Sequence, residues 1–439
     1  MRAVAALGAT LISIAALGAA TAPAQATAPA QAAAPAGVGG LHGRFDPFPR
    51  HVKVAGNSSE LDGVFCASAA DCWAVGVSST KLARLNQVLH WTGKKWFKIA
   101  VPQPGGTGKD DQNELFAVRC TSASDCWAVG DYAKGGAELN EILHWTGKKW
   151  FAVSAPTPAG TLPGDQNVLL DVACTSAASC WATGDYGTDD STTRGEIIKN
   201  QALHWNGKTW SLVPTPNPAG AKKNHANALG SVRCSSQNDC WAAGADGVIG
   251  KKFIVLNQIL HWNGKNWAQE LVVPNPAGTA NGAFNELFGL SCTSAKSCLA
   301  VGTAEKLGPT GKALNEILSW NGTKWRSVHV PNPDGTGSES DNNLSGVTCA
   351  GARDCWAVGF DGLMGKEPVR NQVLHWTGTK WKVVSTPNPG GNGKEDRSTL
   401  VGARCTSPAN CWAVGVQQHS GRADQDQILH WNGTKWVVS

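Results

Sequence analysis

One phrase recurs seven times along the chain: two cysteines separated by five residues and followed, in six copies, directly by tryptophan. The copies read CASAADCWAVG, CTSASDCWAVG, CTSAASCWATG, CSSQNDCWAAG, CTSAKSCLAVG, CAGARDCWAVG and CTSPANCWAVG. They return every 54 to 60 residues. An internal repeat of this length predicts a solenoid or a propeller.

Each repeat contains four short apolar segments. In the second repeat they are Leu115 to Cys120, Cys126 to Gly130, Asn140 to Trp145 and Trp150 to Val153. All four are rich in Val, Ile, Leu and Trp and are bounded by Gly, Asn, Ser or Pro, which is typical of strands. No segment keeps a helical period, so the sequence predicts an all-β chain.

The third and fourth segments are joined by turns such as WTGKKW, whose glycine supplies the positive φ of a tight hairpin. Four antiparallel strands repeated seven times predict a seven-bladed β-propeller over residues 57–439. All twenty tryptophans occupy three positions of the repeat. We expect the tryptophan after the second cysteine to fill the gap between neighbouring blades.

The N-terminus predicts export. Residues 1–26 have a short basic start, an apolar stretch and small-x-small cleavage patterns at Ala24–Ala26 or Ala30–Ala32, and residues 27–56 read as a flexible Ala/Pro/Gly leader. No second apolar run suggests a membrane span. The predicted location is therefore extracellular.

An exported chain with fourteen cysteines in seven pairs of identical spacing predicts disulfides rather than metal ligands. We therefore expect no metal and no cofactor. Each bridge would clamp the first hairpin of one blade. The predicted pairs are Cys66 with Cys72, Cys120 with Cys126, Cys174 with Cys180, Cys234 with Cys240, Cys292 with Cys298, Cys349 with Cys355, and Cys405 with Cys411.

The last repeat stops at Ser439, within its own fourth strand. This predicts a ring that closes without strand exchange between its ends. Residues 50–55 (RHVKVA) either add an edge strand or pack against the ring, and the sequence leaves that choice open.

The repeats CTSASDCWAVG, ILHWNG, KTW and VPTPNPAG resemble those of secreted bacterial propeller proteins with CWAVG and HWNG-x-x-W signatures, over about Leu61 to Ser439. More distantly the chain is similar to kelch and galactose-oxidase propellers. It has one glycine after the second strand, such as Gly130, where those families have two, so this second resemblance implies architecture only.

The two faces of the predicted disc differ in the length of their loops. Both long connections, from strand two to three and from strand four to the next blade, leave from one end of the blades, which we call the loop-rich face. The short turns lie at the other end, the trimmed face. Because variable loops on a rigid scaffold commonly bind ligands, we expect the ligand on the loop-rich face, near Tyr132, Asp185 and Tyr186.

A polar residue two positions before the first leucine of each blade would ring the mouth of the channel on this face. The ring consists of Ser59, Asn113, Asn167, Asn227, Asn285, Asn342 and Ser398. Two interpretations stand: the side chains cap backbone groups at the strand entrance, or they form a polar ring for a ligand.

Three further sets recur. For the histidines before the third-strand tryptophan we expect structural hydrogen bonds, because one metal ion cannot reach across blades. They are His90, His144, His204, His261, His375 and His430.

Three arginines, Arg119, Arg233 and Arg404, could clamp a carboxylate or phosphate. They belong to blades two, four and seven, however, and this spacing favours pairing with nearby acids. Turn lysines would form a rim on the trimmed face, which either discourages edge-to-edge pairing of strands as solvated side chains or docks on anionic envelope polymers: Lys94, Lys95, Lys148, Lys149, Lys208, Lys265, Lys324, Lys380 and Lys435.

The function predicted from these features is a secreted, non-catalytic binding or scaffold propeller that recognises an extracellular carbohydrate or protein. The alternatives are a propeller enzyme acting on carbohydrate, as a hydrolase or lyase, and a purely structural envelope component. No pair of carboxylates is marked as catalytic. A net charge of +5 is modest for 439 residues, so nucleic acid is not an expected partner, and we expect a monomer.

Overall fold

The computed structural model describes residues 57–188, 197–307, 311–363 and 366–439, all within the unit Gly39–Ser439. Strands are the regular secondary structure of this part of the chain. No helix in it is long and apolar enough to cross a membrane. The predicted signal (1–26) and leader (27–56), with residues 50–55, lie outside the described residues.

The strands pair antiparallel in consecutive sets of four, as the sequence predicts, and we number these sheets 1 to 7 in chain order. The first strands are β1 (Ser58–Ser68), β5 (Gln112–Ser122), β9 (Asp165–Ser176), β13 (His225–Ser236), β17 (Ala283–Ser294), β21 (Ser340–Gly351) and β25 (Arg397–Ser407). The second strands are β2 (Asp71–Ser79), β6 (Asp125–Lys134), β10 (Ser179–Thr188), β14 (Asp239–Ile249), β18 (Ser297–Lys306), β22 (Asp354–Leu363) and β26 (Asn410–Gln418).

The fourth strand is the shortest of each sheet, with three residues. The third strands are β3 (Arg84–Trp91), β7 (Ala137–Trp145), β11 (Ile197–Trp205), β15 (Phe253–Trp262), β19 (Lys312–Trp320), β23 (Lys366–Trp376) and β27 (Gln425–Trp431). The fourth strands are β4 (Trp96–Lys98), β8 (Trp150–Ala152), β12 (Trp210–Leu212), β16 (Trp267–Gln269), β20 (Trp325–Ser327), β24 (Trp381–Val383) and β28 (Trp436–Val438).

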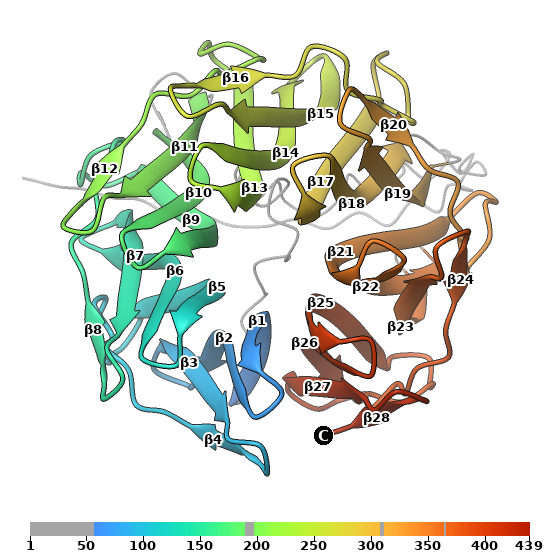
Figure 1. Ribbon diagram of the computed structural model, residues 1–439, viewed down its shortest axis with the longest axis horizontal. Coiled ribbons are helices and arrows are strands. Elements are labelled where there is room, and N and C mark those ends of the chain that lie inside the picture. The colour runs from blue at the N-terminus through green and yellow to red at the C-terminus, as the bar shows by residue number, and fades with distance from the viewer. Residues whose placement is uncertain (1–56, 189–196, 308–310, 364–365) are drawn as a thin grey trace, which may run out of the picture. The chain divides into compact units, whose positions relative to one another are not determined.

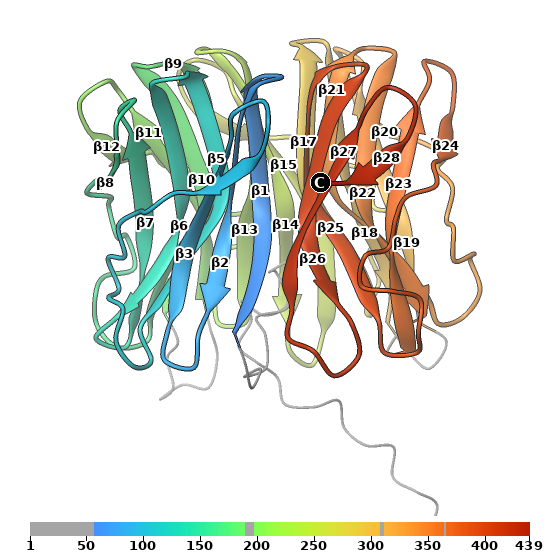
Figure 2. The ribbon, with the colours of Figure 1, turned by 90° about the horizontal axis from the view of Figure 1, so that it is seen from below.

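The sheets stand around a common centre, with the first strands innermost and the fourth strands at the periphery (Figure 1). Each first strand contacts the first strands of both neighbouring sheets, and β25 contacts β1, so the described sheets form a closed ring. The strands run from one face of this ring to the other (Figure 2). The loop-rich and trimmed faces are therefore real features of the fold.

Closure joins sheet 7 to sheet 1 through side chains and single backbone bonds. The amide of Ser59 donates to the carbonyl of Asp424 at 3.0 Å, and Gln87 Nε2 donates to Asp426 Oδ2 at 2.6 Å. Strand β28 pairs with β27 of its own sheet. The described strands thus close the ring without strand exchange between its ends, as the last repeat predicts.

The glycine of the CWAVG motif is required by a bulge in the strand opposite. The register of β5 against β6 shifts between Leu115 and Ala117, directly across from Gly130. A Cβ atom on Gly130 would lie 1.9 Å from the carbonyl oxygen of Glu114. The turn glycines have the expected positive φ, 84° at Gly147.

All seven predicted disulfides are present, each joining the two strands of the first hairpin of a sheet. In the register of β5 with β6, Cys120 faces Cys126 directly. The pair of cysteines therefore marks the same hairpin in every sheet.

The tryptophan after the second cysteine fills the gap between sheets. Trp127, 1% exposed, lies 4.9 Å from Trp205 and 5.3 Å from Trp210 of the next sheet, measured between ring centroids. The same contact closes the ring, because Trp412 of sheet 7 packs on Trp91 and Trp96 of sheet 1. The apolar core is thus a series of clusters between neighbouring sheets.

A second, polar layer also joins the sheets, and the sequence analysis did not anticipate it. Each third strand carries Asn-Gln, Asn-Glu or Asp-Gln, as in Asn257-Gln258. Asn200 Nδ2 donates to Gln258 Oε1 at 2.5 Å, and Asn257 Nδ2 donates to Glu316 Oε1 at 2.6 Å, each across one sheet boundary. Burial raises the pKa of Glu316 well above its ordinary value, and its carboxyl occupies the position that a glutamine amide holds in five of the sheets.

Candidate functional site

The recurring histidines have a structural role, as predicted. His144 Nε2 lies 2.6 Å from Asp125 Oδ1, and its ring stacks on Trp127 at a centroid distance of 4.0 Å. The other five are arranged in the same way, with Asp71, Ser179, Asp239, Asp354 or Asn410 as partner. Burial lowers the pKa of His204 and His430, whose partners are uncharged.

The asparagines expected to ring the channel mouth are buried instead. Asn113 is 1% exposed; its Oδ1 accepts from the amide of Gly105, and its Nδ2 donates to the carbonyls of Arg84 and Gly106. The others make the equivalent three bonds: Asn167, Asn227, Asn285 and Asn342.

These bonds correct the placement expected from the sequence. Each amide fastens the connection from the preceding sheet to its own first strand, which leaves no amide atom directed at a surface ligand. The capping interpretation describes this geometry, and a ligand on this face would meet the loops that the amides hold. At the equivalent positions of sheets 1 and 7, the hydroxyl oxygens of Ser59 and Ser398 accept hydrogen bonds from the backbone amides of Asp426 and Gly390, respectively.

The two tyrosines lie at the loop-rich face as expected, half-buried at equivalent positions of sheets 2 and 3. Lys199 Nζ lies 5.7 Å from the centroid of the Tyr186 ring. Burial raises the pKa of both hydroxyls, helped at Tyr132 by the charge of Glu141. Their neighbours Asp131 and Asp185 are buried. No ring contact joins the two tyrosines within the described residues.

Asp246 occupies the position equivalent to these tyrosines in sheet 4. It is 9% exposed, and burial raises its pKa from 3.8 to about 7. The folded protein therefore holds a proton that the unfolded chain releases between about pH 4 and pH 7. Stability falls as the pH rises through this window, and the loss is complete above the folded pKa.

Asp246→Asn should remove this penalty. We expect the variant to match the parent at pH 3.5 and to exceed its free energy of unfolding by about 2–4 kcal/mol at pH 8, because the amide needs no proton to stay neutral. Urea unfolding at both pH values measures the difference. A difference that does not depend on pH would contradict the raised pKa.

The channel at the centre of the ring offers a different kind of site. Residues from all seven first strands line a cavity of about 160 Å³. Many of the lining residues are small, but the lining also includes five charged residues, the rings of Phe116 and Phe288, and four hydroxyl side chains. The charged residues are Arg119, Arg233, Arg404, Asp62 and Asp171.

Two arginines converge on one ring. The guanidinium carbons of Arg119 and Arg404 lie 4.7 Å and 4.6 Å from the centroid of Phe65, which itself is 6% exposed. The spacing of blades two, four and seven predicted no convergence of these arginines. For this pair the prediction was wrong, because ring closure makes sheets 2 and 7 the two neighbours of sheet 1.

The third arginine is paired, as the sequence analysis expected. Arg233 Nη1 donates to Asp171 Oδ2, which also accepts from Ser231 Oγ at 2.7 Å and from the amide of Val232 at 2.9 Å. Asp171 lies on β9 and the three donors on β13. This carboxylate therefore links sheets 3 and 4 inside the channel.

Positive charge predominates around the cavity. Within the described residues no carboxylate forms an ion pair with Arg119 or Arg404, and Arg404 Nε is buried without a hydrogen-bond partner. Burial lowers the pKa of Arg119 well below its ordinary value, and the charges of Arg233 and Arg404 act in the same direction. Burial and Arg233 likewise lower the pKa of Arg404 to about 10. The charge of Asp171 acts on the pKa of Arg119 in the opposite direction, and neither arginine forms an ion pair within the described residues.

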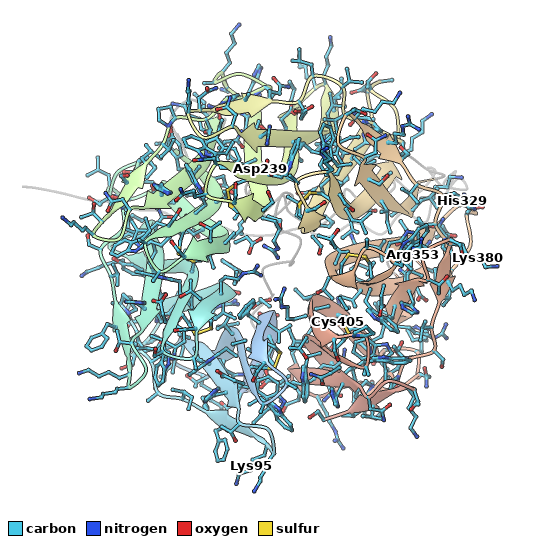
Figure 3. The ribbon with its side chains drawn as sticks, in the orientation of Figure 1. Lys95, Asp239, His329, Arg353, Lys380 and Cys405 are labelled. Atoms are coloured by element: carbon cyan, nitrogen blue, oxygen red, sulfur yellow. A yellow bond between two sulfur atoms is a disulfide. The ribbon has the colours of Figure 1, made fainter. Side chains whose placement is uncertain are left out.

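The arginines lie toward the trimmed face, since each directly precedes the first cysteine near the end of its strand. The nine turn lysines predicted for this face are all exposed. Lys95 and Lys380 project from the periphery of the ring, whereas Cys405 lies near its centre (Figure 3). The trimmed face thus combines central arginines with a basic rim.

Sequence reasoning missed Phe65 and Asp171, and a signal for them exists. The positions one and three residues before the first cysteine vary between repeats, while the leucine and cysteine around them do not. No group of three or more His, Cys, Asp or Glu side chains suited to a metal ion occurs among the described residues.

Comparisons with known proteins report on the fold. No protein-family model matches the chain, and no curated protein matches it in sequence. Among solved structures, a polysaccharide lyase is similar with a TM-score of 0.52 and 9% identity, over 85% of this chain and 90% of that chain. An ulvan lyase of a new polysaccharide lyase family is similar with a TM-score of 0.50 and 9% identity, over 88% of this chain and 97% of that one.

The β-propeller domain of the Trilobed protease from Pyrococcus furiosus is also similar, with a TM-score of 0.45 and 8% identity, over 87% of this chain and 97% of that chain. Identities this low show the fold alone. The closed ring of four-stranded antiparallel sheets defines the described chain as a β-propeller. The finer resemblance to the CWAVG proteins and to kelch propellers stays a prediction.

Proposed function

We propose that this protein is a secreted seven-bladed β-propeller that binds an acidic extracellular polysaccharide through its trimmed face. The observation that carries the proposal is the pair Arg119 and Arg404, which both line the channel cavity, both lie near the ring of Phe65, and form no ion pair among the described residues.

The chemistry of the cavity suits a carboxylate or sulfate group. A guanidinium presents a planar set of donors that fits either group bidentately, and such charge-assisted bonds are stronger than neutral ones. Stacking on Phe65 restricts the rotamers of both arginines before a ligand arrives, which lowers the entropic cost of binding. Thr348 and Ser231 place hydroxyl groups on the same cavity wall.

With the lysine rim, the site can bind a polymer that carries many acidic groups and not only a single acidic group. The exposed turn lysines surround the central arginines, and a polyanion crossing the face would meet both sets. The carboxylates of Asp71, Asp125, Asp239 and Asp354 on this face are each engaged by a histidine. A carbohydrate ligand belongs to the predicted function, but its position on the trimmed face replaces the loop-rich face of the sequence analysis.

Seven disulfides and seven sets of four strands support the secreted, seven-bladed form of the proposal. Cysteine pairs of this regularity persist in oxidising compartments outside the cell. The seven sheets contact one another in a closed cycle, as the blades of a propeller do.

Binding of polygalacturonate, with neutral dextran as comparison, tests the proposal. Arg119→Ala/Arg404→Ala should weaken polygalacturonate binding by about 10- to 100-fold, the effect of losing two charge-assisted contacts. Lys251→Ala/Lys252→Ala removes the same charge from exposed positions at the loop-rich face and should leave affinity nearly unchanged. Equal effects of the two variants, or no binding of any acidic glycan, would overturn the proposal.

Two further measurements separate the alternatives predicted from the sequence. Loss of glycan binding in Tyr132→Ala/Tyr186→Ala, with the arginine variant unaffected, would return the site to the loop-rich face. Cleavage of the bound glycan, followed as new chain ends, would identify an enzyme instead of a binding protein.

A further inference from the structure

Sheet 5 departs from the repeat at two positions that touch each other in the other sheets. Leu299 stands where the other six sheets have tryptophan, and Ser319 stands where they have histidine. In the register of β18 with β19 these two residues face each other. The stacked pair seen as Trp127 on His144 is therefore absent from sheet 5, and both of its rings are missing together.

The missing rings leave a cavity of about 190 Å³ between sheets 5 and 6. Its aromatic walls are Trp320, Trp376 and Trp381, and hydroxyl groups of Ser297 and Ser319 also line it. Leu299 is half-buried, whereas the tryptophans at its equivalent positions are 1% exposed. The space is thus open to solvent on the side where a tryptophan would close it.

The remaining wall keeps the shape of an indole site. At the other six boundaries the tryptophan of one sheet lies against two tryptophans of the next, with centroid distances of 4.7 and 5.5 Å for Trp241 against Trp320 and Trp325. Trp376 and Trp381 form the same tilted pair, 5.8 Å apart, but receive no ring from sheet 5. Trp376 and Trp381 therefore lack the third aromatic ring that packs against the equivalent pair at the other boundaries.

The cavity also offers a hydrogen-bond donor. The six residues equivalent to Trp376 donate their indole N–H to a carbonyl in the first turn of their own sheet, as Trp320 does to Ala295 at 3.1 Å. Within the described residues the Trp376 N–H makes no such bond, and Trp376 lines the cavity. A ligand with an acceptor at its edge would satisfy this donor, whereas indole, which has only a donor, tests the aromatic walls alone.

We propose that this cavity binds a planar aromatic molecule of indole size. Aromatic rings prefer tilted or edge-to-face neighbours at about 4.5–7 Å, which two fixed tryptophans provide. An apolar cavity of about 150 Å³ holds one small aromatic ring. The cavity between sheets 5 and 6 is slightly larger, so its volume suits a bicyclic ring but is too small for a drug-sized molecule. The site is separate from the arginines and does not depend on the function proposed above.

Filling the cavity tests the inference. Indole binding to the whole protein is measured by calorimetry, in the parent and in Leu299→Trp/Ser319→His, which restores the repeat. We expect the filled variant to lose at least about tenfold in indole affinity and to melt about 2 °C higher, because the new rings occupy the site and contact Trp376 and Trp381.

The reverse change at another boundary is the matched control. Trp241→Leu/His261→Ser copies sheet 5 into sheet 4 and should create a second indole site while lowering the melting temperature. If that variant does not fold, the filled variant alone decides the matter, since it removes no packing. Indole affinity unchanged by filling, or a filled variant that melts lower than the parent, would overturn the proposal.

Discussion

Trp127→Ala is expected to lower the free energy of unfolding by about 3–5 kcal/mol, the cost of removing a large side chain from a packed core. Trp127 is 1% exposed and contacts Trp205, Trp210 and His144, so its loss opens the boundary between sheets 2 and 3. In a closed ring that boundary cannot relax without moving the others. The remaining structure can therefore collapse only partly onto the space.

Urea unfolding followed by circular dichroism measures this effect. Phe151→Ala is the control, because Phe151 is also aromatic but is 41% exposed on the short outer strand β8, and we expect a loss below about 1 kcal/mol there. Similar losses in the two variants would show that boundary tryptophans do not hold the ring together.

Much of this fold could be predicted because the determining interactions are local and repeated. The pairing of Cys120 with Cys126 lies within one hairpin, and the glycine of each turn acts within its own turn. Because each pattern occurs in seven copies, its recurrence is not a coincidence of sequence. The position of Trp127 between sheets followed for the same reason, since one aromatic position recurs in nearly every repeat.

The candidate site could not be predicted in the same way, because it depends on contacts between distant repeats. Arg119 and Arg404 meet at Phe65 only when the ring closes, and no spacing along the chain encodes that closure. The repeating polar residues misled the analysis in the opposite direction. Asn113 and its equivalents recur because every connection between sheets needs the same backbone bonds, not because a ligand needs a ring of amides.

This contrast suggests how to interpret a repeat sequence of this kind. Residues that recur in most repeats, such as the histidines and asparagines above, are used by the scaffold itself. Residues at variable positions, such as Arg119, or exceptions at nearly constant positions, such as Leu299, are free of that role. Both sites proposed for this protein consist of such exceptions.

Asp171→Asn separates stability from binding in the channel. Asp171 is 8% exposed and accepts from Ser231, Val232 and Arg233, so the variant leaves Arg233 without its counter-charge and at least one donor without an acceptor. We expect a loss of about 3 kcal/mol in the free energy of unfolding, because breaking a buried ion pair strands the remaining charge.

The same substitution should strengthen binding of polygalacturonate several-fold at low ionic strength, and less at high salt. Removing the carboxylate raises the net charge around Arg119 and Arg404 by one, and added salt screens the resulting attraction. Asp110→Asn makes the same change of charge in an exposed connecting segment, at a positive φ of 68° that asparagine tolerates, and should alter neither property. Weaker glycan binding by folded Asp171→Asn protein would mean that the carboxylate orients the arginines for the ligand rather than competing with it, and the positive channel would then not be the source of affinity.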